Sequence, residues 1–319
     1  MTPWFHGNPM NGRFITQTEL NDLARECGLD GAGVAPAEPP PVDRELVSRL
    51  VSVVPADLQY LRARLEDRLS PGRLLPGVRS VVVAFLSYAG DLPGVEALPR
   101  GRGFVSRFAW GRDYHEVVGG RVSRLAAALE SRHGARTRWY VDTGPVFEKA
   151  YAVAAGLGFI GKNSLFIHPR YGSFVFLGTI LTDLEVPDPP VTREGGCARC
   201  SACRSACPVG ALDRPYVLNT QRCLARVLVS DRSPPAAELA PRLHGNLFGC
   251  DLCQDVCPYN RRAERPLHRE FVPFPGTYMP RIDRVLRMDA AEFQAVFGPT
   301  PVLRRPLALL QATARCLLE

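Results

Sequence analysis

The pattern of apolar and polar residues in the first half of the chain predicts helices that alternate with strands. Apolar residues at helical spacing predict a helix over Thr16 to Cys27, and Thr16 and Glu19 stand in capping-box positions. The run from Ser80 to Tyr88 is apolar at successive positions, which predicts a strand buried on both faces. This alternation indicates an α/β domain over residues 15–190. The other elements predicted there are strands over Gly31–Ala35, Arg138–Val141 and Ser173–Thr182 and helices over Asp43–Val53, Ala56–Leu69, Asp113–His133 and Val146–Ala155.

Stretches rich in proline, glycine and arginine divide the rest of the chain. Residues 1–14 are polar and rich in Pro and Gly, and we expect them to form a flexible tail. The Pro/Gly-rich segment 187–196 is typical of a linker, here to a cysteine-rich module over residues 191–262. Residues 263–319 are expected to form a short helical segment, with helices around Ala290–Phe297 and Pro306–Leu318.

The composition is that of a soluble globular protein, with 46% hydrophobic and 22% charged residues among 319. No run of 18 apolar residues occurs, and the N-terminus lacks the apolar core of a signal peptide, so we expect a cytoplasmic protein without membrane contact. The net charge of +7 permits a polyanionic partner such as RNA but, taken alone, is more typical of a moderately basic surface. The two lysines, Lys149 and Lys162, both fall in one short segment.

Eight of the ten cysteines lie between Cys197 and Cys257, and in a cytoplasmic chain such clustering indicates metal rather than disulfides. The first group has the spacing C-x2-C-x2-C-x3-C-P of bacterial ferredoxins, in which the fourth cysteine serves the other cluster. The second group, C-x2-C-x3-C-P, is one cysteine short, and Cys223 between the groups can complete the count. We therefore predict two 4Fe-4S clusters. The expected ligands are Cys197, Cys200, Cys203 and Cys257 for cluster one and Cys207, Cys223, Cys250 and Cys253 for cluster two.

Zinc is the alternative metal, because four-cysteine zinc sites also use C-x2-C pairs. Such sites pair two knuckles, and they do not need a triple run that closes in Cys-Pro. The spacing therefore favours iron–sulfur clusters, and two neighbouring clusters form a path for single electrons. The end of that path is expected in the α/β domain.

Two short motifs in the α/β domain match known binding signatures only in part. The glycines from Gly156 to Gly161 match G-x-G-x-x-G by letter, but a helix precedes them where the dinucleotide fingerprint requires a strand. We expect these glycines instead to let the backbone approach a large planar or anionic group, and Lys162 to suit a phosphate or amide-rich ligand. The D-Y-H sequence that ends at His115 would begin a corrinoid motif, D-x-H-x-x-G, but Val118 replaces the glycine. His115 is therefore interpreted as a hydrogen-bonding histidine near a helix start.

Asp142 ends a predicted strand, the position at which α/β sheets place ligands. A partly desolvated carboxyl group there could hold its proton near neutral pH and act as a general acid. An N-cap for the following helix is an equally good interpretation from position alone. Glu148 and Lys149 lie in that helix, where a solvated salt-bridge face is their expected role.

Several sequence blocks stand out: LLPGVRSV from Leu74, FAWGRDYH from Phe108, YVDTGPVFEK from Tyr140, GLGFIGKNS from Gly156, GSFVFLG from Gly172 and the cysteine module. In their order and spacing these blocks resemble the epoxyqueuosine reductases, from about Ile15 to about Arg305. The resemblance implies a mixed α/β (α+β) corrinoid-binding domain similar to that of reductive dehalogenases, followed by a bacterial ferredoxin-like module and short C-terminal helices.

The resemblance implies that the protein reduces the epoxide of epoxyqueuosine in the anticodon loop of tRNA, the last step of queuosine synthesis. It implies a cobalamin held without a histidine ligand and reduced by the two clusters, with Asp142 as the acid that protonates the leaving oxygen before water is lost. We also expect an unidentified low-potential electron donor and a monomer. By the same resemblance, the cobalamin contacts are Asp142, Gly161, Lys162, Asn163, Ser164, Phe166 and Asp251.

The sequence departs from the family pattern in places. Many members continue into C-terminal HEAT-like repeats, and none is expected here. Asp57-Leu58 replaces a usual Gly-Met, and Gln311 to Leu317 follows the family only loosely. Without the repeats, more of the tRNA contact is expected to fall on arginines such as Arg222, Arg226, Arg261 and Arg262.

Two other functions stay open on the sequence. One is a corrinoid iron–sulfur reductase that acts on a small molecule such as an organohalide. The other is a plain electron carrier whose α/β domain docks a partner. A buried, closed entrance to the cobalt site would favour a small-molecule substrate, whereas an open entrance lined by basic residues would favour tRNA.

Overall fold

The computed structural model describes residues 14–37, 47, 63–185 and 195–318. The predicted tail over residues 1–14 apart from Phe14, the helix over 43–53 apart from residue 47, and the linker up to residue 194 therefore lie outside the described residues. Of the helix predicted over Ala56–Leu69, the described part contains α4 (Leu65–Leu69).

A four-stranded sheet forms the centre of the N-terminal part, in the order β1-β2-β7-β4. Its strands are β1 (Gly31–Pro36), β2 (Ser80–Ser87), β7 (Val175–Thr182) and β4 (Thr137–Tyr140). All three strand pairs are antiparallel. Because β2 is an inner strand buried at every position, the prediction of a central strand there is confirmed.

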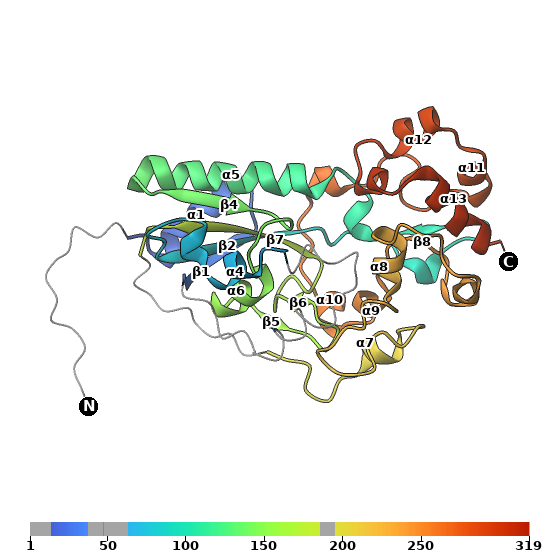
Figure 1. The fold of residues 1–319 in the computed structure, drawn as a ribbon, viewed down its shortest axis with the longest axis horizontal. Helices are drawn as coiled ribbons and strands as arrows, with labels where there is room; N and C mark the ends of the chain where they lie inside the picture. The colour runs from blue at the N-terminus through green and yellow to red at the C-terminus, as the bar shows by residue number, and fades with distance from the viewer. Residues whose placement is uncertain (1–13, 38–46, 48–62, 186–194, 319) are drawn as a thin grey trace, which may run out of the picture.

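Helices cover both faces of this sheet (Figure 1). α1 (Gln17–Glu26) and α5 (Tyr114–His133) pack on one face, and α6 (Glu148–Ala154) packs on the other. The Thr16 side chain accepts a hydrogen bond from the backbone N–H of Glu19, so the predicted N-cap of α1 is confirmed. Helices and strands therefore alternate along the chain as the sequence predicts.

A small hairpin follows α6 and contains the glycines that match G-x-G-x-x-G. Its strands are β5 (Phe159–Ile160) and β6 (Phe166–Ile167). A Cβ atom on Gly158 would lie 2.2 Å from the backbone oxygen of Ile167, and one on Gly161 would lie 2.5 Å from the Ile167 side chain. These two glycines are needed for the hairpin to close on itself, and the expectation that they also let the backbone approach a ligand stays a prediction.

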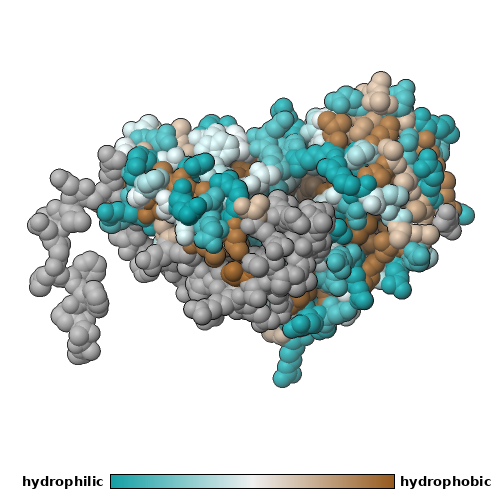
Figure 2. Space-filling model, viewed as in Figure 1, coloured by the Kyte–Doolittle hydropathy of each residue, from teal (hydrophilic) through white to brown (hydrophobic). Residues whose placement is uncertain are grey.

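The cysteine module and the C-terminal segment consist of short helices and loops. α11 (Ile282–Arg287), α12 (Ala290–Phe297) and α13 (Leu307–Cys316) form the C-terminal segment. Figure 2 shows apolar residues on the surface over these helices, and Leu303 and Leu318 are among the exposed large apolar side chains. The helices of the cysteine module are α7 (Ala202–Ser205), α8 (Leu224–Val229), α9 (Leu252–Asp255) and α10 (Pro258–Arg261).

Two short parallel strands join segments that are far apart in the sequence. β3 (Phe104–Val105) precedes α5, and it pairs with β8 (Asn246–Phe248) of the cysteine module. Both strands and Trp110 belong to one hydrophobic core with α11, α12 and α13. Residues before α5 therefore pack with the C-terminal third of the chain, an arrangement that the sequence does not predict.

Among the described residues, no helix is both long enough and apolar enough to cross a membrane.

Candidate functional site

A cavity of about 250 Å³ opens between the sheet and the cysteine module. Its aromatic part is a stack in which the Phe176 ring lies 4.2 Å from the Tyr88 ring and 4.4 Å from the Tyr114 ring, measured between ring centres. Gln254, the residue after Cys253, lines the same cavity, so the cavity adjoins the second group of cysteines. The other lining residues are Phe108, Asp142, Glu148, Lys149, Leu165, Phe166, Ser173, Val175 and Leu177.

Asp142 lies at the mouth of this cavity, directly after β4. Its φ of 56° is in the left-handed region, which Asp and Asn adopt more readily than most residues. Its Oδ2 atom accepts a hydrogen bond from the Tyr114 hydroxyl at 2.8 Å, and its backbone N–H donates to Glu148 at 2.9 Å. The side chain is 57% exposed, so a large substrate can reach it.

His115 lies beside Asp142 and joins it to the start of α5. Its Nε2 atom is 3.3 Å from Asp142 Oδ2, and its Nδ1 atom is 3.0 Å from Asp113 Oδ1. Burial alone would lower the pKa of His115, but the hydrogen bonds to the two carboxylates raise it to about 9. The interpretation of His115 as a hydrogen-bonding histidine is confirmed.

The same contact changes the expected protonation state of Asp142. The hydrogen bond from His115 lowers the pKa of Asp142, and burial only partly opposes it. Burial alone therefore does not keep this carboxyl group protonated, contrary to the hypothesis from the sequence. In the His115–Asp142 pair, the proton resides on the histidine at neutral pH.

Glu148 and Lys149 both line the cavity, where Glu148 is half-buried and Lys149 is exposed, so the expectation of a solvated face is wrong for Glu148 alone. Burial, together with the charge of Asp142, raises the pKa of Glu148 to about 8. Burial lowers the pKa of Lys149, whose Nζ donates to the backbone oxygen of Ser164 at 3.1 Å. The sequence did not reveal the partial burial of Glu148, because the wall of the cavity beside α6 comes from the hairpin and β7.

Four cysteines of the predicted first set line a second cavity, also of about 250 Å³. These are Cys197, Cys200, Cys203 and Cys257, and Cys203 interacts electrostatically with the other three. Among the described residues, no three Cys, His, Asp or Glu side chains converge on one point closely enough to hold a single metal ion. Four thiols around a cavity suit a cluster, which holds its ligands farther apart than zinc does.

The other predicted set also lies together. Electrostatic interactions link Cys223, Cys207 and Cys250, and Cys253 interacts with Cys250 and Cys223. Apolar side chains that include Leu224 pack around this group. All ten cysteines lie in the described part of the chain, and none forms a disulfide.

The predicted cobalamin contacts separate into three places. Asp142 and Phe166 line the first cavity, whereas Asn163 lines the cavity of the first cysteine set. The Lys162 ammonium donates to the backbone oxygens of Ala198 and Cys200, at 2.6 and 2.9 Å. Lys162 therefore fastens the hairpin to the first cysteine loop, and its expected role toward a phosphate or amide-rich ligand stays a prediction.

Two more of these contacts have distinct surroundings. Ser164 follows the hairpin turn of Gly161 with a left-handed φ of 63°, and its Oγ atom is buried without a hydrogen-bond partner in the described structure. Asp251 is 1% exposed and does not line the first cavity. Its carboxylate accepts hydrogen bonds from the Ser106 hydroxyl and from the Arg107 backbone N–H, the latter at 2.8 Å.

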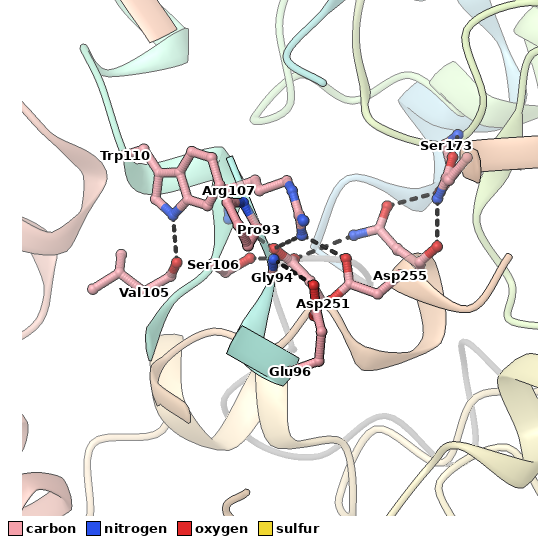
Figure 3. A network of polar contacts seen from close by, with 12 residues as sticks. Pro93, Gly94, Glu96, Val105, Ser106, Arg107, Trp110, Ser173, Asp251 and Asp255 are labelled. Atoms are coloured by element: carbon pink, nitrogen blue, oxygen red, sulfur yellow. Dashed lines mark hydrogen bonds and ion pairs between the residues drawn. The ribbon is translucent and has the colours of Figure 1, made fainter. Parts of the chain in front are cut away.

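Arg107 connects Asp251 to the rest of the cluster-two loop, as Figure 3 shows. Its Nη1 atom lies 3.3 Å from Asp251 and 2.5 Å from Asp255. The guanidinium also lies over the Trp110 ring, 5.3 Å from its centre. Arg107 and Asp251 thus brace the loop of Cys250 and Cys253 against the segment before α5, a role that the sequence did not indicate.

The four arginines considered for tRNA contact differ in exposure. Arg222, Arg261 and Arg262 are exposed, and Arg222 pairs with Asp213 at 3.2 Å. The Arg226 side chain is only 16% exposed and lies 3.6 Å from Asp231. Three of the four are therefore accessible to a large partner.

Two family models match this chain. Residues 68–143 match "Epoxyqueuosine reductase QueG, DUF1730", and residues 196–260 match "4Fe-4S double cluster binding domain". The second match defines the class of protein: a two-cluster iron–sulfur protein. Its span contains all eight cysteines of the two predicted sets.

Proteins of similar sequence and structure identify the family of this chain. An epoxyqueuosine reductase of Gloeobacter violaceus is 39% identical over 310 residues, which cover 94% of this chain and 95% of the relative. A solved epoxyqueuosine reductase with an epoxyqueuosine-modified tRNA-Tyr stem loop is 34% identical, with a TM-score of 0.83 over 95% of this chain and 80% of that one. A Bacillus subtilis structure, described as having its catalytic aspartate loop swung out of the active site, is 32% identical over the same shares, with a TM-score of 0.80. The chain belongs to the epoxyqueuosine reductase family.

Proposed function

We propose that this protein reduces the epoxide of epoxyqueuosine in tRNA to the alkene of queuosine, with cobalamin and two 4Fe-4S clusters as its cofactors. The observation that carries the proposal is the shared lining of one cavity. Asp142 lies at its open side, and Gln254 joins it to the cysteines of cluster two. A proton donor and an electron path therefore meet at one place, which the reductive removal of an epoxide oxygen requires.

The open mouth of the cavity favours tRNA over a small molecule. The Asp142 side chain is more than half exposed, and Arg304 lies close to it through Asp113 and His115. A nucleoside that is part of a folded RNA can reach such an acid only from outside. The exposed Arg222, Arg261 and Arg262 are candidates to bind its phosphates.

The residues around the cavity fit a large ring with amide side chains. The stacked rings of Tyr88, Tyr114 and Phe176 offer a flat apolar wall. Ser164, which precedes the lining residue Leu165, has a buried hydroxyl that lacks a partner among the described residues. We propose that these residues, with Phe166, hold cobalamin. When bound, it would supply a low-valent cobalt that engages the epoxide.

Removal of the epoxide oxygen as water takes up two electrons, which come through the clusters, and two protons. The His115–Asp142 pair delivers the protons one at a time and is reprotonated from water at the open mouth. The His115–Asp142 pair holds one proton, which resides on His115 Nε2 in the open protein. A substrate that covers the mouth removes water from Asp142, which raises the pKa of its carboxyl group. The proton then moves to Asp142 Oδ2, from which the leaving oxygen of the epoxide can take it. Protonation is needed because an unprotonated alkoxide is a poor leaving group.

We propose cluster ligation as the two sets of cysteines predict it, with cluster two next to the cavity and cluster one farther along the path. The Lys162 contacts to the first cysteine loop support the placement of cluster one at the hairpin. We further propose action as a monomer in the cytoplasm, where tRNA is modified, with a separate low-potential protein as the electron donor.

An anaerobic turnover assay tests the function. The iron-loaded protein, with and without added cobalamin, receives a stem loop that carries epoxyqueuosine and a strong chemical reductant. Digested nucleosides are then identified by mass spectrometry, and we expect queuosine only when cobalamin is present. Absence of queuosine from protein that holds its full iron and corrinoid would refute the tRNA substrate, and turnover of an organohalide by the same sample would favour the small-molecule reductase.

A further inference from the structure

Two adjacent arginines in the C-terminal segment point to opposite parts of the site. Arg304 is the last residue of a short 3-10 helix, Pro301–Arg304, and Arg305 is its C-cap residue. Val302 of this helix packs in the C-terminal core. Arg304 reaches the first turn of α5 next to the cavity, and Arg305 reaches the cysteine module. In Figure 1 the start of α5 lies close to the C-terminal helices.

Arg304 contacts the residues that hold the proton donor. Its Nη2 atom forms an ion pair with Asp113 and lies 2.6 Å from His115 Nδ1. Its guanidinium also lies over the ring of Tyr114, 5.5 Å from the ring centre. Tyr114 and His115 are the two residues that contact Asp142 Oδ2. One guanidinium therefore touches every side chain that orients Asp142 from α5.

Arg305 binds the helix that begins at a cluster-two cysteine. It is 1% exposed, and its Nη1 atom donates to the backbone oxygens of Val227 and Asp231, at 3.2 and 2.7 Å. Cys223 is the N-cap residue of that helix, α8. Because Arg304 and Arg305 are neighbours, the position of Arg304 is fixed relative to the cysteine module.

We propose that Arg304 is a positioning residue for the proton donor, and that Arg305 sets its position from the cluster-two helix. Arg304 holds Asp113, Tyr114 and His115 so that His115 Nε2 and the Tyr114 hydroxyl point at Asp142. The C-terminal segment thereby takes part in the active site without contact with Asp142. The inference rests on the proposed role of Asp142 as the proton donor.

The charges that face His115 give the proposal a pH signature. They are the carboxylates of Asp113 and Asp142, the guanidinium of Arg304 and, behind Asp142, Glu148. Burial and the charge of Arg304 lower the pKa of His115, whereas the two carboxylates raise it. Loss of the Arg304 charge therefore raises the pKa of His115, so that the His115 side chain loses its proton at a higher pH.

Three variants distinguish the effect of the Arg304 charge, the effect of its geometry and the effect of losing any surface arginine. Arg304→Gln removes both the positive charge and the forked guanidinium group. Arg304→Lys keeps the charge, but its single ammonium group cannot contact Asp113 and the Tyr114 ring at the same time. Arg284→Gln is the matched control, because Arg284 forms a surface ion pair with Glu292 in the same C-terminal segment. Each protein is loaded with iron and cobalamin, and single-turnover rates on the stem loop are measured from pH 6 to 10 together with stem-loop affinity.

We expect Arg304→Gln to lower the single-turnover rate about tenfold, because the acid is misoriented. We also expect the fall of the rate at alkaline pH to occur at a higher pH than in the wild type. In Arg304→Lys the rate should be intermediate and should fall at the same alkaline pH as in the wild type. Arg284→Gln should match the wild type in both rate and pH profile. Stem-loop affinity should stay unchanged in all three. A wild-type rate and pH profile for Arg304→Gln would overturn the inference. So would a fall in affinity that accounts for the whole loss of rate, because Arg304 would then bind the RNA.

A second measurement decides the inference even if the assay yields no queuosine. The histidines are labelled with 13C, and the titration of His115, assigned with His115→Gln, is followed by NMR in the iron-loaded protein. A higher pKa of His115 in Arg304→Gln, and an unchanged one in Arg284→Gln, support the contact. An unchanged titration in Arg304→Gln would overturn it, whatever the substrate of the enzyme.

Discussion

Asp142 occupies a backbone position that suits few residues, and this limits which substitutions are informative. A left-handed φ of 56° is tolerated by Asn but strained for most other side chains. Asn also retains an oxygen that can accept the hydrogen bond from Tyr114. A change to Asn therefore removes the ionisable group with little effect on the loop.

For Asp142→Asn we expect the single-turnover rate on the epoxyqueuosine stem loop to fall by about 10² to 10⁴, because a general acid contributes that much. Stem-loop affinity and cluster absorbance should stay at wild-type levels. Rate and affinity are measured on the same anaerobic sample. A rate within a few-fold of the wild type would mean that another group delivers the proton.

Glu148 gives a second residue-scale prediction, which concerns stability. Its pKa is raised to about 8 in the folded protein, above the ordinary value of 4.5. Between these values the folded protein binds more protons than the unfolded chain, so the free energy of unfolding falls as pH rises from about 4.5 to about 8. His115, with its pKa raised from 6.5 to about 9, adds a similar fall between those values.

We expect Glu148→Gln to reduce the loss of thermal stability between pH 6 and pH 9, because Gln has no proton to lose. The midpoint of thermal unfolding of the iron-loaded protein is measured anaerobically at both pH values. Glu66→Gln is the control, since Glu66 is exposed on α4. An equal drop in Glu148→Gln and in the wild type would contradict the burial of this carboxyl group.

At the scale of elements, α5 packs closely on β7 because residue 178 of β7 is a glycine without a side chain. A Cβ atom on Gly178 would lie 2.5 Å from Val122 Cγ2, and Val122 is fully buried. The Val122 methyl group can move only by displacing α5 or its own core neighbours. The start of α5 carries Tyr114 and His115, so this packing also affects the active site.

We therefore expect Gly178→Ala to destabilise the protein by about 1–3 kcal/mol, the usual cost of overpacking a core. Gly72→Ala is the matched control, because a Cβ atom there meets nothing within 4 Å, and it should be neutral. Chemical denaturation of both variants measures the difference. Equal stability of the two variants would mean that α5 can shift without cost.

The elements also show what the sequence could predict. Long periodic or continuously apolar segments such as α1, α5 and β2 were predicted within a few residues, because their burial pattern is local. The two- and three-residue strands β3 and β8 carry no periodic signal, and their pairing depends on a remote partner. The partial burial of Glu148 and the contacts of Lys149 and Lys162 were not predicted for the same reason, since other segments decide them.

At the scale of the whole molecule, the cysteine spacing predicted both ligand sets, and the fold brings each set together. Spacing indicates which cysteines lie together because a cluster imposes its own geometry on the loops that bind it, and the ligation itself stays a prediction. The contacts of Arg304 and Arg107 were not predictable, because each joins segments more than 140 positions apart.

A cysteine substitution tests the two sets. We expect Cys223→Ser to hold about four iron atoms where the wild type holds about eight, because cluster two loses a ligand and cluster one keeps its own. Iron and acid-labile sulfide are measured on anaerobically reconstituted protein. Cys316→Ser is the control, since Cys316 belongs to neither set, and it should retain about eight. Full iron in Cys223→Ser would contradict the assignment of this residue.

The pairing of β3 with β8 has a consequence for how the chain is made. A ribosome releases Phe104 long before it has synthesised Asn246, the residue that β3 pairs with. Until then the apolar side chains around Trp110 have no core to enter, because α11, α12 and α13 are also still missing. Such late-paired segments fold slowly and are prone to aggregate while they wait. We therefore expect nascent chains that end before residue 246 to bind chaperones that recognise exposed apolar segments, and full-length chains to be released from them.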